Sequence, residues 1–431
     1  MKTVEEAVAF FHSLERFGVN PGLERIGALC EILGHPEKRC RYVHVAGTNG
    51  KGSVCTEISN VLREAGFVTG LYTSPYVLDF RERIQVNNRM ISAEDLIAAA
   101  DQVKSAVESL NARGVYPTEF EAVTAAAFLH FANTGCKIVV LETGLGGRFD
   151  ATNIIEAPIV SVITSISLDH VKILGDTLDK IAFEKCGIIK PLCHTVTDAA
   201  NPTEALNVIR ETAAARGSYL FEASPGGLFQ VISSDITGTQ IEYRGVRMRI
   251  PFPGEHQIRN AAAAIKACEV LGVSGFDLTV KHIKSGLEAS FIPARTEIMH
   301  GSPPVVLDGS HNDDSTLALA KVLRAYLSGK RILAVMGMME DKDCEKAVRN
   351  LQGCFTEVIA VTPSNPRAMP AEKFRDLLTE NGYTASAVPD PLKAIDEAFL
   401  RLADFDALVV CGSLYLASDV RAHILEKISF I

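Results

Sequence analysis

A glycine-rich segment between an apolar run and a helical pattern constrains this chain most strongly. Residues 41–46 are mostly apolar, Gly47-Thr-Asn-Gly-Lys-Gly-Ser53 follows, and an amphipathic helical pattern covers 52–65. Glycines allow backbone N–H groups to converge on a phosphate, and the start of the helix adds positive potential. Lys51 can reach the outer phosphates, and the Ser53 hydroxyl can ligate Mg²⁺. The segment therefore predicts a nucleoside triphosphate site at the end of a strand.

The spacing of this loop differs from the standard phosphate-binding pattern. That pattern requires Gly at 45 and Ser or Thr at 52, where this chain has Val45 and Gly52. The alternative is a glycine-rich turn that happens to contain a lysine. Turn chemistry alone does not account for a lysine enclosed by three glycines at a strand–helix junction, so the phosphate site is favoured.

Length and composition set the class of protein. A chain of 431 residues is too long for one ordinary core, which predicts two domains. Hydrophobic residues make up 47% and charged residues 22%, as in soluble globular proteins. The net charge of −9 argues against general nucleic-acid binding, which requires a basic face. A few local cations can still attract a small anionic substrate.

The cysteines and the N-terminus indicate the compartment. Ten cysteines occur singly, without a Cys-x-x-Cys pair or zinc-ligand spacing, so we expect buried thiols in a reducing cytosol. Apolar residues between Val4 and Leu14 follow a helical period, which predicts a helix and not a signal peptide. No apolar run approaches the roughly 20 residues of a membrane span. These features predict a cytoplasmic protein without a membrane partner.

Alternating patterns predict the fold of the first domain. Helical patterns near 52–65, 92–112 and 118–133 alternate with Val- and Ile-rich runs at 41–46, 67–72, 137–142 and 158–164. This alternation is typical of a doubly wound, mostly parallel sheet that binds ligands at the carboxyl ends of its strands. Residues 219–250 instead alternate apolar and polar side chains between glycines, which predicts an antiparallel insertion. Helices are expected near 257–271 and 277–288.

A Pro- and Gly-bearing segment at 290–304 indicates a domain boundary. A second alternating series follows, with strands expected near 304–308, 331–336, 356–361, 384–388 and 406–411. We therefore expect two α/β domains, 1–296 and 297–431. The first is a P-loop-type doubly wound sheet with a small antiparallel β insertion, and the second is Rossmann-like.

Polar residues follow two further strands of the first domain. Glu142 ends the run 137–142 and precedes a glycine-rich stretch. A carboxylate beside a phosphate loop is what Mg²⁺ requires, although Glu142 could also cap a turn. Asp169 and His170 follow the next strand. A lone histidine is more often an ordinary loop residue, but a neighbouring phosphate site favours a functional role.

Two isolated cations allow a structural and a functional interpretation. Lys185 lies near the end of a helix that begins near Thr177 and ends at Gly187. The sequence alone favours a cation that neutralises the helix C-terminal dipole. Arg295 lies in the segment between the two domains, where its guanidinium could reach a phosphate or could be a surface charge.

The first strand of the second domain also ends in polar residues. Asp308, His311 and Asn312 follow it, and we expect them to be exposed. An aspartate in this position commonly accepts a hydrogen bond from a ribose hydroxyl. The alternative is that Asn312 or Ser310 caps the next helix, and both roles can coexist.

Together these motifs resemble the folylpolyglutamate synthase/dihydrofolate synthase family of the Mur ligase superfamily. The resemblance covers nearly the whole chain and rests on matches in a fixed order. They are Gly22–Ile26, His44–Ser53, Thr73–Tyr76 with Glu82–Ile84, Phe120–Glu121, Glu142–Asn153, Leu168–His170, Glu184–Ile188, His256–Gln257 with Asn260, Pro293–Arg295, Asp308–Asn312, Asp341–Asp343 and Gly412–Tyr415.

The resemblance implies an ATP-dependent ligase. ATP would phosphorylate a carboxylate of a reduced folate or of dihydropteroate, and the amine of L-glutamate would displace the phosphate. The implied catalytic residues are Lys51, Glu142, His170 and Lys185. The implied ATP contacts are Gly47, Thr48, Asn49, Gly50, Lys51, Gly52, Ser53, Asn260, Arg295, Asp308 and His311. The family also suggests a monomer.

The resemblance further implies two Mg²⁺ sites and a folate site. Ser53, Ser74 and Glu142 would hold one ion, and Glu142, His170 and Lys185 the other. In this family the lysine that matches Lys185 is carbamylated by CO₂, which converts a cation into a carboxylate-like ligand. The implied folate contacts are Phe120, Asp150, Thr152 and Asn153, with Phe120 stacking on the pterin and Asp150 binding its amino edge.

Two alternatives compete with this assignment. A peptidoglycan-precursor ligase of the same superfamily would need a further domain before the phosphate loop, where only about forty residues stand. A switch or binding module could use ATP without ligation. The sequence also departs from the family at Tyr76, Glu119 and Cys186. The first two lie near the expected folate pocket, so they bear on substrate preference and not on the ATP chemistry.

Overall fold

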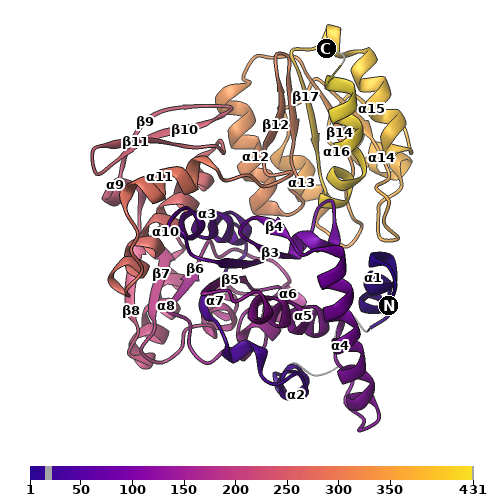
Figure 1. Cartoon of the computed structure of the whole chain (residues 1–431). Coiled ribbons are helices and arrows are strands. Elements are labelled where there is room, and N and C mark those ends of the chain that lie inside the picture. Colours follow the sequence, from indigo (N-terminus) through magenta and orange to yellow (C-terminus); the bar gives the residue numbers. More distant parts are fainter. Residues whose placement is uncertain (15–21, 430–431) are drawn as a thin grey trace. The chain divides into compact units, whose positions relative to one another are not determined.

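Two α/β sheets organise the chain, one in each of two units (Figure 1). The computed structural model describes residues 1–14 and 22–429. Unit 1 consists of Met1–Gln230, Ile241–Arg249 and Ile258–Ser290, and unit 2 of Val231–Gln240, Ile250–Gln257 and Phe291–Ile431. The expected domain limits, 1–296 and 297–431, stay a prediction.

An eight-stranded sheet with the order β4-β3-β2-β5-β1-β6-β7-β8 forms the centre of unit 1. Its strands are β1 (Arg41–Ala46), β2 (Thr69–Tyr72), β3 (Ile84–Val86), β4 (Arg89–Met90), β5 (Ile138–Glu142), β6 (Val160–Ile163), β7 (His194–Asp198) and β8 (Tyr219–Ala223). The β2–β3 and β3–β4 pairs are antiparallel and the remaining pairs are parallel. The predicted central strands are confirmed, and their carboxyl ends meet at one edge.

Helices cover both faces of this sheet. On one face α3 (Lys51–Glu64) contacts β1, β2 and β5 and packs against α11 (Val280–Glu288). On the other face Tyr42, Tyr72 and Leu141 pack against a helical layer. That layer contains α1 (Val4–His12), α2 (Glu24–Ile32), α4 (Ala93–Asn111) and α5 (Glu119–Asn133). Further along the sheet, α7 (Leu178–Cys186) and α8 (Thr203–Arg216) pack around Ala46 and Ile163.

Shorter helices and one long helix complete unit 1. The long helix is α10 (Glu255–Val273), whose first residues fall in unit 2. The short ones are α6 (Val171–Leu174), α9 (Pro225–Leu228) and the 3-10 helices η1 (Pro36–Lys38), η2 (Phe80–Arg83) and η3 (Ala151–Ile154). Local signals set the helix starts: the Thr118 hydroxyl accepts from Glu121 N at 3.3 Å, and Glu121 Oε2 accepts from Thr118 N at 2.7 Å.

The prediction of one antiparallel insertion over 219–250 is wrong in its first part. β8 pairs in parallel with β7 and forms the edge of the large sheet. The small three-stranded sheet contains only β9 (Gln230–Asp235), β10 (Gly238–Tyr243) and β11 (Val246–Ile250). An edge strand is buried less than a central one, and Tyr219 is 70% exposed. Its mixed pattern therefore resembles that of a half-buried antiparallel strand.

A six-stranded sheet with the order β12-β13-β17-β14-β15-β16 forms unit 2. Its strands are β12 (Glu297–Gly301), β13 (Pro304–Leu307), β14 (Ile332–Met336), β15 (Glu357–Ala360), β16 (Ala385–Ala387) and β17 (Ala407–Cys411). Only β12 is antiparallel to its neighbour. One core of this unit includes residues of α12 (Asp313–Tyr326), α13 (Cys344–Asn350) and α14 (Ala371–Glu380). The remaining helices are α15 (Pro391–Leu400) and η4 (Leu402–Asp404), which follow β16, and α16 (Leu414–Ile428), which follows β17. The predicted Rossmann-like alternation is confirmed.

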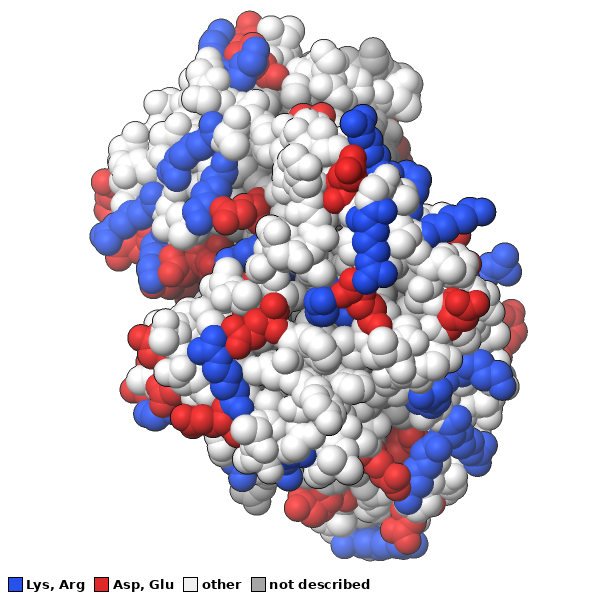
Figure 2. All heavy atoms as spheres, turned by 90° about the vertical axis from the view of Figure 1, so that its left-hand side faces the viewer, with Lys and Arg blue, Asp and Glu red and all other residues white. Residues whose placement is uncertain are grey.

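The thiols and the surface agree with the composition. All ten cysteines are free, and nine of them are buried, with Cys40 half-buried. On the face drawn in Figure 2, acidic and basic side chains lie interspersed and are separated by uncharged surface. None of the helices in the described ranges is long and apolar enough to cross a membrane.

Candidate active site

The phosphate loop connects β1 to α3 in a conformation that only glycine suits at its turning point. Gly50 is the N-cap of α3 and has φ 84°. A Cβ at Gly50 would lie 2.3 Å from Asn260 Oδ1, so a side chain there would be strained and would also clash. The same contact places Asn260 of α10 against the loop. The structure thereby brings together Gly50 and Asn260, which are 210 positions apart in the sequence and which the resemblance predicts as ATP contacts.

Hydrogen bonds tie the loop to the segment that follows β6. Thr48 N donates to Ser165 O at 2.7 Å, and Thr48 Oγ1 donates to Ser167 O at 3.0 Å. Thr164 Oγ1 and Ser165 Oγ donate to Asn49 O at 2.7 and 3.2 Å. These side chains fix the loop before any ligand binds. No role was predicted for Thr164, and its only signal in the sequence is a hydroxyl at the end of an apolar strand.

Two lysines converge on one carbonyl of the loop. Lys51 Nζ donates to Gly47 O at 3.1 Å and to Thr48 O at 3.2 Å. Lys185 Nζ donates to the same Gly47 O at 2.8 Å, and Lys185 is only 4% exposed. Burial lowers the pKa of Lys185 to about 7, and the charge of Lys51 acts in the same direction. The sequence alone favoured a cation that neutralises the helix C-terminal dipole, whereas the structure shows a buried amine that donates to the loop.

Glu142 reaches the loop from the end of β5. Its side chain is 5% exposed, and Oε2 accepts from Ser74 N at 3.0 Å. A Cβ at Gly52 would lie 3.7 Å from Glu142 Oε2, which places the carboxylate beside the first turn of α3. Ser53 in that turn is 4% exposed. The structure therefore gathers a carboxylate and two serines around the loop.

A metal ion at this site would need ligands other than carboxylates and imidazoles. In the described ranges, no three His, Cys, Asp or Glu residues are grouped so that they could hold a metal ion. One buried carboxylate, serine hydroxyls and phosphate oxygens are the hard ligands that Mg²⁺ accepts. These residues therefore fit a magnesium ion that arrives with a nucleotide.

Asp169 acts on the buried Lys185, and His170 is the next residue along the chain. His170 has φ 50°, and its side chain is 48% exposed. Its Nε2 lies 4.0 Å from Asp169 Oδ1. The charge of Asp169 raises the pKa of Lys185 and so partly opposes the effect of burial. Asp169 thus acts on the buried amine, while His170 keeps half of its side chain exposed.

Aromatic groups and a buried arginine surround the predicted folate site. A Cβ at Gly144 would lie 2.5 Å from Phe120 Cζ, so glycine is required for the ring to lie there. The centroid of Tyr72 is 6.0 Å from that of Phe120. The Arg83 guanidinium lies 5.7 Å from the Phe120 centroid and 5.4 Å from that of Phe80. Arg83 is 6% exposed, and no role was predicted for it.

Asp150 is held by its own loop. Its Oδ2 accepts from Leu145 N at 2.8 Å, and its Oδ1 accepts from Thr152 N at 3.0 Å and from Thr152 Oγ1 at 2.6 Å. Burial raises the pKa of Asp150, and these hydrogen bonds oppose the rise. Thr152 is 0% and Asn153 3% exposed. A direct folate contact by either would require it to become exposed, whereas here both support the loop.

Asp308 in unit 2 is buried and not exposed as expected. Its exposed fraction is 8%. Oδ2 accepts from Thr296 N at 2.7 Å and from Thr296 Oγ1 at 2.9 Å, and Oδ1 accepts from Ser310 N at 2.8 Å. The expectation failed because the carboxylate is needed to hold Thr296, a β-branched residue with φ 48°.

The helix-capping alternative for this segment is confirmed. Asn312 is the N-cap of α12, and its Oδ1 accepts from Ser315 N at 2.9 Å. His311 is half-buried, and its Nδ1 lies 2.9 Å from Gly309 O, the geometry of an N–H donating to a carbonyl. The second ring nitrogen, Nε2, is the one that a phosphate could approach.

Arg295 lies in a strained and well-anchored segment. Ala294 and Thr296 on either side have φ 57° and 48°. Glu297 accepts from Ala294 N at 3.1 Å and from Arg421 Nη2 at 2.7 Å. Arg295 itself is half-buried and forms no hydrogen bond or ion pair within the described ranges. The backbone is therefore fixed, while no residue in the described ranges binds the guanidinium.

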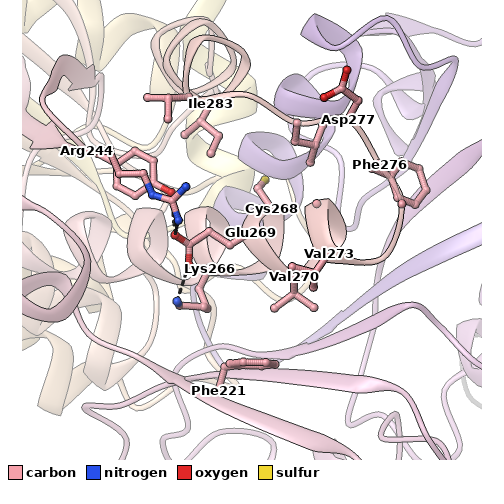
Figure 3. A pocket seen from close by; sticks show the side chains of 15 residues that line it. Phe221, Arg244, Lys266, Cys268, Glu269, Val270, Val273, Phe276, Asp277 and Ile283 are labelled. Carbon is pink, nitrogen blue, oxygen red and sulfur yellow. Dashed lines mark hydrogen bonds and ion pairs between the residues drawn. The ribbon is translucent and has the colours of Figure 1, made fainter.

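A separate pocket in unit 1 has a volume of about 720 Å³ and lies near the end of α10 (Figure 3). Three of its charged groups pair with one another, because Glu269 accepts from Arg244 Nη2 at 2.6 Å and Lys266 Nζ at 2.5 Å, as well as from Tyr243 Oη at 2.8 Å. None of the predicted site residues lines it. The pocket therefore does not belong to the candidate active site.

Comparison with known proteins assigns the family. The Mur ligase middle domain model matches residues 45–268, and the "Mur ligase, glutamate ligase domain" model matches 294–414. The dihydrofolate synthase/folylpolyglutamate synthase of Bacillus subtilis is 37% identical over 97% of this chain and 99% of its own length. The chain belongs to the folylpolyglutamate synthase/dihydrofolate synthase family of Mur ligases.

Solved structures of this family have the same fold. The folylpolyglutamate synthase of Mycobacterium tuberculosis, solved with ADP and AMPPCP, aligns with a TM-score of 0.88 and 28% identity over 97% of this chain and 98% of that one. Escherichia coli FolC, solved with DHPP and ADP, aligns with a TM-score of 0.84 and 28% identity over 100% and 98%. The predicted Mur ligase fold is thereby confirmed, while the roles of single site residues stay predictions.

Proposed function

We propose that this protein is an ATP-dependent ligase that joins L-glutamate to the carboxylate of a folate through an acyl phosphate. The observation that carries this proposal is the match along nearly the whole chain to relatives named for this activity, over both Mur ligase domain models. The glycine-rich loop at Gly47–Ser53, with Lys51, would bind the phosphates of ATP. Nucleotide use is supported by the relatives solved with ADP and AMPPCP.

The reaction has two balanced steps. A folate carboxylate oxygen attacks the γ-phosphorus of ATP, and the bond to the β-phosphate oxygen breaks to release ADP. The glutamate nitrogen then attacks the carbonyl carbon of the acyl phosphate, loses a proton, and phosphate leaves. Lys51 would exchange the Gly47 and Thr48 carbonyls for phosphate oxygens. The Lys51 ammonium and the loop amides would stabilise the charge on the transferring phosphoryl group.

The remaining nucleotide contacts follow the resemblance. Asn260 would contact the adenine side, and Arg295 and His311 the phosphates. Asp308 would accept from the ribose through the remaining lone pair of Oδ1, since Oδ2 already accepts two hydrogen bonds from Thr296. The Arg295 guanidinium has no hydrogen-bond or ion-pair partner among the described residues, which supports its part of this assignment.

Two Mg²⁺ ions would complete the site. Ser53, Ser74 and Glu142 would hold one, and Glu142, His170 and a modified Lys185 the other. When bound, the ions would neutralise the charge of the phosphates. The buried carboxylate of Glu142 beside Gly52 supports the first site.

The modification of Lys185 is a carbamylation. Its neutral amine would attack CO₂ to form a carbamate, and one proton would pass to solvent. The pKa of about 7 and the neighbouring Lys51 support this step, because a neutral amine is the nucleophile and a nearby cation stabilises the carbamate anion.

We propose that the acceptors are both dihydropteroate and reduced folates. The Bacillus subtilis relative is named for both activities, and the E. coli protein was solved with DHPP. Phe120 would stack on the pterin and Asp150 would bind its amino edge. The Thr152 hydroxyl would hold Asp150, and Asn153 would hold the loop by donating to Arg148 O and Gly187 O. We further propose that the enzyme acts as a cytoplasmic monomer and binds neither nucleic acid nor membranes.

The test is phosphate release by the purified protein with Mg-ATP and L-glutamate. Dihydropteroate, tetrahydrofolate and no acceptor are compared. Release with both acceptors is expected. Release with tetrahydrofolate alone would restrict the enzyme to polyglutamate extension. Release that ignores the acceptor and glutamate would contradict ligation and would favour an ATP-dependent switch.

A further inference from the structure

A buried chain of hydrogen bonds runs from the strand before the phosphate loop to Asp150. His44 lies on β1 between Tyr42 and Ala46 and shares their face of the sheet, because side chains alternate along a strand. It is 0% exposed. Its Nε2 lies 2.8 Å from Thr152 Oγ1, and Thr152 Oγ1 lies 2.6 Å from Asp150 Oδ1. A polar side chain in a core position needs such a partner, since an unpaired buried nitrogen is costly.

The chemistry of the three groups fixes the direction of the chain. A threonine hydroxyl has one proton, and an ionised carboxylate can only accept. At 2.6 Å from Asp150, the Thr152 proton must therefore lie on the hydrogen bond to the carboxylate. The Thr152 oxygen then accepts from His44, so His44 carries its proton on Nε2. Burial lowers the pKa of His44 to about 3, with the charge of Lys190 acting in the same direction, so the ring is neutral.

The other ring nitrogen agrees with this tautomer. Among the described residues, His44 Nδ1 has no hydrogen-bond partner and is buried. A buried bare lone pair is the less costly choice, because an unpaired N–H group would lose its hydration as a donor. Both observations place the proton on Nε2. The His44 N–H then donates to Thr152 Oγ1, and the Thr152 hydroxyl donates to Asp150.

The chain completes the set of donors that hold Asp150. The backbone amides of Leu145 and Thr152 donate to its carboxylate, the amide of Gly144 also acts on it, and the Thr152 hydroxyl donates a further hydrogen bond. The amides are fixed by the fold, but a hydroxyl can rotate. His44 is the group that prevents this rotation, since it occupies the oxygen lone pair that would otherwise be free.

We propose that His44 is a positioning residue for acceptor binding, acting through the Thr152 hydroxyl to hold Asp150 toward a heteroaromatic ring that presents N–H donors. The inference rests on the proposed function, because Asp150 binds the acceptor only if that function holds. It assigns a role to a fully buried residue of β1 for which the sequence predicted none.

Thr152→Val keeps the size of threonine and removes the hydroxyl. Thr152→Ser keeps the hydroxyl and loses a methyl group. We expect Thr152→Val to raise KM for the folate acceptor about tenfold, as outer-shell changes commonly do, and Thr152→Ser to stay near wild type. His44→Phe should raise the same KM, and His44→Gln, whose amide N–H reaches a similar position, should restore most of the loss. KM for ATP should change less than about twofold in all four variants.

A double variant separates positioning from general damage. If His44 acts only through Thr152, then His44→Phe adds nothing to the acceptor KM once Thr152→Val is present. Fully additive effects would overturn the inference. So would a His44→Phe enzyme with a lowered Tm and an unchanged acceptor KM, since that result would make His44 a purely structural residue.

Nitrogen NMR of the histidines in the substrate-free, full-length protein gives an independent readout. The His44 signals, assigned by their loss in His44→Gln, should show a protonated Nε2 and a bare Nδ1. The opposite tautomer would contradict the proposed direction of these hydrogen bonds, whichever substrate the enzyme uses. If folates support phosphate release but neither variant moves the acceptor KM, only the role of His44 fails. If no folate supports release, the proposed function fails and the acceptor role fails with it.

Discussion

The phosphate loop of unit 1 and the 294–312 segment of unit 2 use their charged groups in opposite ways. In the loop, the Lys51 ammonium donates to the backbone carbonyls of Gly47 and Thr48, two neutral acceptors that an anionic phosphate can replace. In the second segment, Asp308 accepts from Thr296 and Ser310 and so holds its own backbone. In this pair the Lys51 ammonium, whose partners are replaceable, is available to a ligand, whereas the Asp308 carboxylate is mainly committed to its own backbone.

Arg295 shows that both uses coexist in one segment. The backbone around it is held in left-handed conformations by Asp308 and Glu297, while its own guanidinium has no partner in the described part of the chain. Strained backbone of this kind costs roughly 1–3 kcal/mol per residue, so other interactions must maintain it. The comparison therefore predicts that substitutions in the loop affect activity, and that Asp308 affects stability and Arg295 activity.

The largest effect is expected for Lys51→Ala. The change removes the ammonium group that would stabilise the transferring phosphoryl group, so kcat should fall at least about a thousandfold. The Tm should stay close to that of wild type, because the side-chain partners of Lys51 in the described part of the chain are two loop carbonyls. Phosphate release and thermal unfolding measure the two quantities. A variant that keeps a tenth of the activity would contradict the role of Lys51.

Lys185→Ala should lower kcat at least about a hundredfold, more than an outer-shell change, because it removes a proposed metal ligand. Wild-type enzyme in CO₂-depleted buffer should lose activity and regain it on addition of bicarbonate. The variant should not respond to bicarbonate. Activity is measured as phosphate release over a series of bicarbonate concentrations. Wild-type activity in Lys185→Ala would refute the carbamate.

The buried lysine also predicts a cost in stability. Folding lowers the pKa of Lys185 from 10.5 to about 7, so between these values the unfolded chain binds more protons. Stability of the unmodified protein therefore rises with pH in this range, and below pH 7 the unfavourable contribution is complete. Lys185→Met should be more stable than wild type at pH 6, and the difference should shrink toward pH 10. Urea unfolding in CO₂-free buffer tests this, and a difference that is constant with pH would contradict it.

Asp308→Ala should act mainly on stability. It leaves the amides of Thr296 and Ser310 without their acceptor, so the free energy of unfolding should fall by about 2 kcal/mol. Asp308→Asn keeps one acceptor oxygen and should lose less. Urea unfolding of the two variants gives the comparison. If both variants unfold like wild type but have a raised KM for ATP, then Asp308 is a ligand contact first and the contrast with the loop fails.

The sequence predicted the parts of this molecule that depend on neighbours along the chain. β1, β5 and β6 are buried on both faces, so their apolar runs were clear, and the loops at their carboxyl ends followed from the parallel sheet. The cap at Asn312 was also predicted as one of two alternatives, because it involves residues three positions apart.

Features that depend on distant contacts could not be predicted from the residues alone. The last turn of a helix suits both a surface cation and a buried amine, and only the contact with Gly47 O decides between them for Lys185. Asp308 accepts hydrogen bonds from Thr296, which lies 12 positions earlier in the sequence. His44 meets Thr152 across 108 positions. In each case the partner is set by the fold, and no spacing rule connects the two residues.

Arg295→Ala should have the smallest effect and sharpens the comparison most. The guanidinium has no protein partner among the described residues, so its removal should leave the Tm unchanged. Loss of one charged hydrogen bond to a phosphate should raise KM for ATP about tenfold. Arg421→Lys is the control, because Arg421 forms a two-pronged pair with the 7%-exposed Glu297 in the same unit. It should lower the Tm and leave KM for ATP unchanged. If Arg295→Ala instead lowers the Tm while KM for ATP does not move, then Arg295 supports the fold like Asp308, and unit 2 contributes no free cation from this segment.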